Sequence, residues 1–205
     1  MNAVMFIQLW HSKRSTNEET NFDFYKNKAD DFLFGKKPAA WRPFQLAFIL
    51  LNLDGIIQRL DDPGWKCRNE SVDLVWFPTG GGKTEAYLGI IALSIIFRRR
   101  QYPEIGGGTT AIMRYTLRLL ATQQFQRAMR LILALEQLRR WNLYNLGDEP
   151  ISIGLFVGED SLPNNAKSLS DECQKWNTVD DSGKRRESKI PLDKCPCCGR
   201  PLKYQ

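Results

Sequence analysis

Histidine is nearly absent from this chain, since His11 is the one histidine among 205 residues. Chemistry that depends on paired histidines, whether catalytic or metal-binding, is therefore excluded. Cysteine is also scarce, and four of the five cysteines lie late in the chain. This distribution does not fit the disulfide framework of a small secreted domain. The cysteine content therefore favours a reducing, cytoplasmic location.

Long hydrophobic runs are missing as well. The longest apolar stretch, residues 87–97, falls well short of the roughly 20 residues that a membrane-spanning helix needs. Residues 1–10 are apolar but lack the basic leading region and small-residue cleavage site of a signal peptide. We therefore expect no membrane association, and we interpret residues 87–97 as part of a core helix.

Charge is unbalanced only mildly. Lysine and arginine number 29 against 23 acidic residues, which gives a net charge of +6 and an isoelectric point near 9.1. A basic excess of this size is compatible with a nucleic-acid partner but does not by itself identify one. The hydrophobic content of 42% is sufficient for a folded core.

A glycine-rich loop is the most informative motif. An apolar run at residues 72–77 is followed by a loop whose residues are Thr79, Gly80, Gly81, Gly82, Lys83 and Thr84. Consecutive glycines let backbone N–H groups turn toward an anion, and the helix that follows adds its positive dipole end. In such a phosphate-binding loop the lysine contacts the β- and γ-phosphates of ATP, and the threonine hydroxyl holds Mg²⁺. We predict both as catalytic residues.

One position departs from the phosphate-loop pattern. The pattern begins with a glycine that is separated by four residues from the Gly-Lys-Ser/Thr triplet, and this chain has Phe77 at that first position. The alternative interpretation is a glycine-rich turn beside an ordinary surface lysine. The predicted strand before the loop and helix after it favour the phosphate-binding interpretation.

Alternating periodicities predict an α/β fold. Apolar residues recur at helical spacing in residues 41–60, 83–100 and 116–141, and short apolar runs at 72–77, 109–113 and 151–157 are typical of buried strands. Strands that alternate with helices predict a parallel sheet. We therefore expect an irregular N-terminal extension (1–40), the first part of an ATP-binding domain (41–158) and a polar insertion (159–205).

The motif set resembles the first motor domain of superfamily-two helicases and translocases. Beyond the glycine loop, it comprises Trp-Arg-Pro-Phe-Gln ending at Gln45, Arg-Tyr-Thr-Leu-Arg-Leu-Leu-Ala-Thr-Gln beginning at Arg114, and the Val157–Gly158 turn. The resemblance implies a partial RecA-like domain in which Gln45 reads adenine. It also implies that four residues contact a nucleic-acid backbone, with DNA favoured over RNA: Thr116, Arg118, Gln123 and Gly158.

The amino-acid sequence of the glycine loop is similar to that found in one branch of this superfamily. Trp-Phe-Pro-Thr-Gly-Gly-Gly-Lys-Thr, together with Arg-Tyr-Thr-Leu-Arg-Leu-Leu, resembles the large helicase-like ATPases of DISARM-type anti-phage defence. The resemblance covers about residues 41–158, and Phe77 is normal in that branch. It implies that this chain is an N-terminal portion, with the remainder of a split helicase or other defence proteins as partners.

The late cysteines form a separate motif. Cys195 and Cys198 are spaced as Cys-x-x-Cys and are followed by Gly-Arg-Pro-Leu, which looks like one knuckle of a zinc ribbon. Two thiolates are half of the four ligands that a structural zinc ion needs. The interpretation is therefore half a zinc site, against the alternative of reduced, exposed thiols.

An acidic hydrolysis motif is missing from the expected place. Asp171 and Glu172 follow a polar segment that cannot be the required buried strand, and Glu159 and Asp160 come one strand too early. We therefore expect the chain to bind ATP without hydrolysing it at a useful rate. Two alternatives stay open: a nucleotide-binding adaptor that never hydrolyses, and a zinc-ribbon nucleic-acid binder whose glycine loop is incidental.

Overall fold

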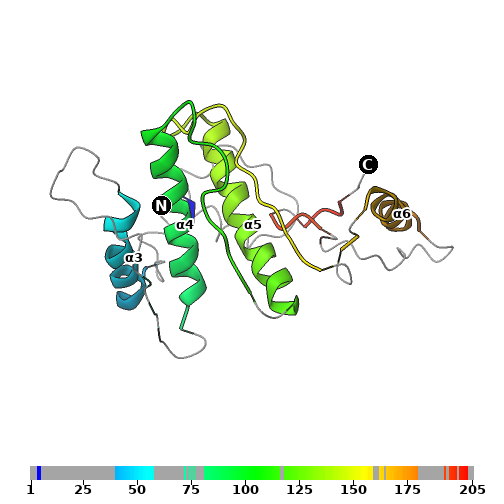
Figure 1. Cartoon of the computed structure of the whole chain (residues 1–205), viewed down its shortest axis with the longest axis horizontal. Coiled ribbons are helices and arrows are strands. Elements are labelled where there is room, and N and C mark those ends of the chain that lie inside the picture. Colours follow the sequence, from blue (N-terminus) through cyan, green and yellow to red (C-terminus); the bar gives the residue numbers. More distant parts are fainter. Residues whose placement is uncertain are drawn as a thin grey trace. The chain divides into compact units, whose positions relative to one another are not determined.

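Four helices make up the regular structure in the described part of the chain (Figure 1). They are α3 (Pro43–Ile56), α4 (Lys83–Gln101), α5 (Arg118–Arg140) and α6 (Ala166–Asn177). The structure is a computed structural model that describes residues 4–5, 40–57, 72, 74, 76, 81–115, 118–158, 162–163, 165–179, 192, 194–197 and 199–202, with backbone only for 118–120. The helices predicted at 41–60, 83–100 and 116–141 are confirmed as α3, α4 and α5.

The predicted parallel sheet is wrong, and the RecA-like α/β fold that rests on it is wrong too. No strand is present in the described residues, where Lys194 and Pro201 form an isolated antiparallel bridge. Large apolar side chains in all three expected strands are almost fully exposed: Val72 (95%), Leu74 (92%), Trp76 (88%), Ile112 (87%) and Phe156 (101%). A short apolar run becomes a strand only where neighbouring strands accept its hydrogen bonds, and the described residues of these segments show no such ladder.

The chain forms two compact units. The first comprises Met1–Ile7, Thr20–Ile112 and Ala134–Ile151, and the second comprises Gln8–Glu19, Met113–Leu133 and Ser152–Gln205. The first unit thus contains α3, α4 and the C-terminal end of α5, and the second contains the beginning of α5 and α6. In the described part of the chain, none of the helices combines the length and apolar character required to cross a membrane.

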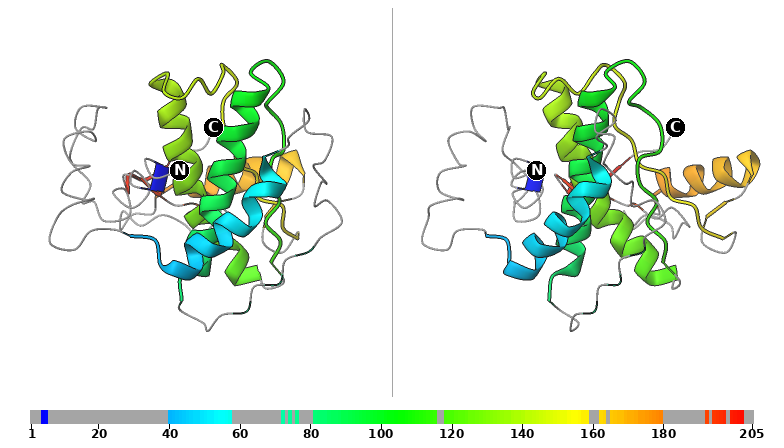
Figure 2. Two further views of the ribbon diagram at one scale, coloured as in Figure 1. Left: turned by 90° about the vertical axis from the view of Figure 1, so that its left-hand side faces the viewer. Right: turned by 60° about the vertical axis from the view of Figure 1, so that its left-hand side comes forward.

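Helices α3 and α4 pack directly against each other in the first unit (Figures 1 and 2). The contact is close because Gly89 has no side chain: a Cβ there would lie 2.9 Å from Trp41 Cη2 and 3.3 Å from Ile49 Cδ1. Phe48 and Tyr87 meet edge to face, with ring centroids 5.5 Å apart. This packing fixes the beginning of α3 beside the beginning of α4.

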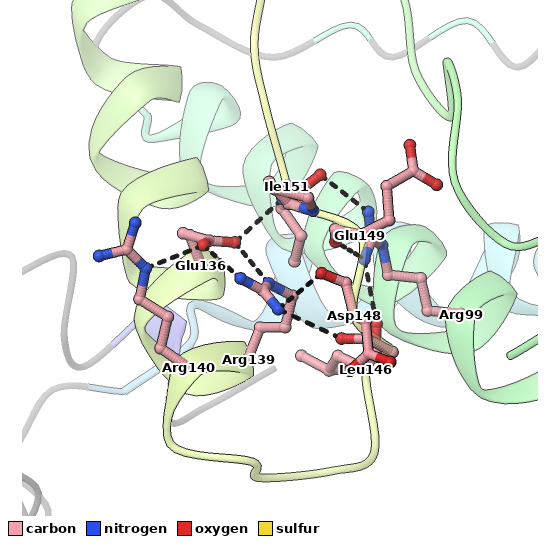
Figure 3. A network of polar contacts seen from close by, with 10 residues as sticks. Arg99, Glu136, Arg139, Arg140, Leu146, Asp148, Glu149 and Ile151 are labelled. Atoms are coloured by element: carbon pink, nitrogen blue, oxygen red, sulfur yellow. Dashed lines mark hydrogen bonds and ion pairs between the residues drawn. The ribbon is translucent and has the colours of Figure 1, made fainter. Parts of the chain in front are cut away.

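A network of ion pairs around the buried Glu136 anchors the loop that follows α5 (Figure 3). The Glu136 carboxylate accepts hydrogen bonds from Arg139 Nε and Nη2 at 2.8 Å, from Arg140 Nε at 3.0 Å and from the Ile151 N–H at 3.0 Å. Arg99 of α4 donates to the carbonyl groups of Leu146, Glu149 and Pro150. The basic end of α4 is therefore a structural anchor as well as a favourable partner of the helix dipole.

The network predicts a pH-dependent stability. The two hydrogen bonds from Arg139, together with those from the Ile151 N–H and Arg140, lower the pKa of Glu136 from 4.5 to about 2, although burial opposes the shift. A depressed folded-state pKa stabilises the fold above the unfolded value, and this contribution is lost as pH falls from about 4.5 to about 2. We expect urea unfolding followed by circular dichroism to show a loss of about 3 kcal/mol across that window. The same decrease in a Glu136→Gln variant would contradict this origin.

Candidate nucleotide site

Gly82 forms the N-cap of α4 and lies in the left-handed region, with φ 90° and ψ 31°. Glycine adopts this conformation without the Cβ penalty of other residues. Lys83 and Thr84 follow as the first two residues of the 19-residue helix, and both are half-buried. The N–H groups of a helix's first turn and its positive dipole end make this the part of α4 suited to an anion. The predicted ligands Thr79 and Gly80 lie outside the described residues.

Two side chains at the start of α3 hold the glycine turn. Arg42 Nη1 donates to the Gly81 carbonyl at 2.8 Å, and Gln45 Nε2 donates to the Gly82 carbonyl at 2.7 Å. Gln45 Oε1 in turn accepts the backbone N–H of Arg42 at 2.8 Å. We call this arrangement the Arg42–Gln45 clamp. Pro43 at the first position of α3 and glutamine at the third are a known helix-start signature, so the local sequence builds the clamp.

The clamp determines which way the glycine peptides face. In a trans peptide the C=O and the N–H point in opposite directions. Because the carbonyls of Gly81 and Gly82 point to α3 side chains, the N–H groups of Gly82 and Lys83 are directed away from those side chains. Adjacent N–H groups with a common direction form the type of nest that binds anions.

A carboxylate also lies in the first turn of α4. Glu85 Oε2 is 3.4 Å from the position that a Cβ on Gly82 would occupy, while Gln45 Nε2 is 2.8 Å from the same position. Any side chain at residue 82 would therefore collide with the clamp as well as strain the backbone. Sequence reasoning identified Gln45 but missed Arg42 and Glu85. The proline and glutamine after Arg42, which mark a helix start, were the available signal for Arg42.

The predicted nucleic-acid contacts belong to the second unit. Gln123 lies exposed on α5, and Gly158 is exposed with its carbonyl 3.4 Å from the Leu162 N–H. Arg118 is the first residue of α5, but its side chain and Thr116 lie outside the described residues. The nucleic-acid role of these four residues stays a prediction.

Of the acidic pairs considered for hydrolysis, the later one lies in α6. Glu172 forms an ion pair with Lys175 at 2.8 Å, on a helix rather than at the end of a strand. Glu159 and Asp160 lie outside the described residues.

The cysteine motif forms a tight turn. The Cys195 N–H donates to the Arg200 carbonyl at 2.9 Å, the Gly199 N–H donates to the Cys195 carbonyl at 2.8 Å, and Gly199 is left-handed with φ 68°. Neither Cys195 nor Cys197 takes part in a disulfide within the described residues, and Cys198 lies outside them. The described residues contain no group of three or more potential metal ligands. Zinc binding by Cys195 and Cys198 stays a prediction.

A known protein is similar to this chain along the chain's whole length. The chain is 40% identical, over 213 aligned residues that include all of it, to the DISARM protein DrmA of Bacillus paralicheniformis. It spans 18% of that relative's length. No protein-family model matches the chain. The similarity supports a relationship to a DISARM anti-phage protein, as the sequence motifs predicted. It does not show that the chain is part of a helicase.

Proposed function

We propose that this chain binds the triphosphate of a magnesium nucleotide at the beginning of α4. The observation that carries the proposal is the glycine turn, whose carbonyls are held by the Arg42–Gln45 clamp. The N–H groups of Gly82 and Lys83 would donate to phosphate oxygens, the Lys83 ammonium would neutralise them, and the Thr84 hydroxyl would hold Mg²⁺. Thr79 and Gly80 would complete the loop on its N-terminal side.

We propose binding without useful turnover for the 205-residue chain alone. Hydrolysis needs a carboxylate that holds Mg²⁺ and one that polarises the attacking water. The pair at 171–172 is a poor candidate, because Glu172 is ion-paired within α6. The Lys83 and Thr84 side chains therefore supply phosphate and magnesium contacts only.

The wider role that we propose is anti-phage defence. Its support is the similarity to the DISARM protein DrmA, which the chain matches along its own whole length. In this proposal the chain is the nucleotide-binding portion of a DNA-dependent, helicase-like ATPase. Thr116, Arg118, Gln123 and Gly158 would contact the nucleic-acid backbone. The alternative function, a nucleotide-binding adaptor that never hydrolyses ATP, would use the same nucleotide site. It differs from the ATPase in that DNA would have no effect on the chain.

Titration calorimetry with Mg-ATP tests the nucleotide site. We expect binding by the chain, and we expect Lys83→Ala to weaken it about 30-fold, since a charge-assisted contact contributes roughly 2 kcal/mol. Lys167→Ala is the matched control, because it removes an exposed lysine from the first turn of α6 and should leave the affinity unchanged. Absence of heat with folded protein, or equal affinity in the Lys83 variant, would refute the proposal.

A further inference from the structure

Gln45 is nearly inaccessible to a ligand. Its side chain and backbone together are 6% exposed, and both functional groups of its amide already have partners. Oε1 accepts the Arg42 N–H at 2.8 Å, and Nε2 donates to the Gly82 carbonyl at 2.7 Å. A glutamine amide carries two donor hydrogens and two acceptor lone pairs, so one of each is left. Because the residue is so little exposed, this remaining donor and acceptor are hardly accessible to a nucleobase.

Reading adenine would require Gln45 to abandon this arrangement. Recognition of the adenine edge by a glutamine uses the acceptor for the N6 amino group and the donor for N7. Turning the amide toward a base would break the hydrogen bond to the Arg42 N–H, which caps α3, and the hydrogen bond to the Gly82 carbonyl, which positions the glycine turn. Gly82 packs so closely on the amide that even a Cβ would come within 2.8 Å of Nε2.

We infer that Gln45 is a positioning residue for the phosphate loop and that the site accepts nucleoside triphosphates without selecting the base. This inference rests on the proposed function and names its ligand class. Gln45 fixes the Gly82 carbonyl, and thereby the direction of the Lys83 N–H, for any triphosphate. Arg42 does the same at Gly81 with a hydrogen bond of 2.8 Å. Recognition is then confined to the phosphates and the magnesium ion.

Competition titrations of the full chain with Mg²⁺ and ATP, GTP, CTP, UTP or inorganic tripolyphosphate test the inference. We expect the dissociation constants of the four nucleotides to agree within about 3-fold and tripolyphosphate to compete with all of them. Gln45→Ala should weaken all four nucleotides by a similar factor of about 10, because it loosens the shared phosphate loop. Gln45→Glu, which keeps the acceptor for the Arg42 N–H but loses the donor to Gly82, should weaken them at least as much.

Asn52→Ala is the matched control, since the Asn52 amide bonds only within α3, to the Phe48 carbonyl at 2.9 Å. It should leave every affinity unchanged. A preference of the unmodified chain for ATP of 10-fold or more would overturn the inference and leave the proposed function standing, and its selective loss in Gln45→Ala would identify Gln45 as the residue that reads the base. Failure of all five ligands to bind folded protein would refute the proposed function and the inference together. The preference of the unmodified chain decides the question even if a variant fails to fold.

Discussion

Replacing Glu136 by glutamine is expected to lower the free energy of unfolding by about 3 kcal/mol, because removing one partner of a buried ion pair leaves the other uncompensated. The carboxylate is 11% exposed and accepts four hydrogen bonds, two of them from Arg139. A glutamine amide places an N–H₂ group where two of those donors now point, so donors would face donors. Urea unfolding at pH 7, followed by circular dichroism, measures the change.

Arg140→Gln is the control within the same network. Arg140 makes a single 3.0 Å contact to Glu136 and is 69% exposed, so we expect its loss to cost less than about 1 kcal/mol. Equal effects of the two substitutions would show that the Glu136 contacts are a surface feature rather than the anchor of the loop. The loss in the free energy of unfolding of the unmodified chain, as pH falls from about 4.5 to about 2, is an independent measure of the same contribution.

Replacing Gly106 by alanine is also expected to destabilise the fold by about 3 kcal/mol, through overpacking against atoms that cannot move alone. A Cβ there would lie 2.5 Å from the Tyr102 carbonyl oxygen, 2.9 Å from the Arg99 Cα and 3.1 Å from the Arg98 carbonyl oxygen. All three atoms belong to the backbone at the end of α4. Shifting Arg99 would in addition disturb its hydrogen bonds to the loop after α5.

Gly107→Ala is the adjacent control for this prediction. The three atoms nearest to the added Cβ all belong to the Glu149 carboxylate, the far end of an exposed and flexible side chain that can swing aside. We expect a loss below about 1 kcal/mol in thermal or urea unfolding. If Gly107→Ala destabilised the chain as much as Gly106→Ala, the close backbone approach at Gly106 would not be the cause.

Helical periodicity was sufficient to predict three of the four helices. Long apolar patterns identify a helix because the buried face recurs every three to four residues, as in the buried residues of α4: Ala86, Leu88, Gly89, Ala92, Ile95 and Arg99. Helix α6 was missed because its surroundings are polar. Its available signals were the N-cap Asn165, which accepts the Ser168 N–H at 2.8 Å, and the helical spacing of Leu169, Cys173 and Trp176.

Apolar runs could not show in the same way whether a sheet is present. A strand is stabilised by hydrogen bonds to a neighbouring strand that is often far away in sequence. Its own apolar run therefore shows only that the segment is able to form a strand. Trp76 and Phe156 show the result, since each belongs to an expected strand and is almost fully exposed. Run length and composition do not reveal whether a pairing partner exists.

The residues of the candidate site could be predicted from the sequence, but the hydrogen bonds between them could not. The sequence identified Gln45 and the residues from Gly81 to Thr84 as members of one site, and the structure brings Gln45 against Gly82. It did not reveal that the partner of Gln45 is the glycine turn itself, because a hydrogen bond across 37 residues depends on how α3 packs on α4. The role of Arg42 depends on the same packing.

Nuclear magnetic resonance of the chain labelled with ¹⁵N at its 15 glycines tests the central claim most directly. If main-chain N–H groups at the beginning of α4 hold a triphosphate, Mg-ATP should shift the amide resonances of Gly81 and Gly82 strongly. Those of Gly106, Gly107 and Gly108, at the opposite end of α4, should remain in place, and in Lys83→Ala the shifts of Gly81 and Gly82 should need about 30-fold more nucleotide. Resonances of Gly81 and Gly82 that stay unchanged at saturating nucleotide, or move no more than those of the three distant glycines, would contradict the account.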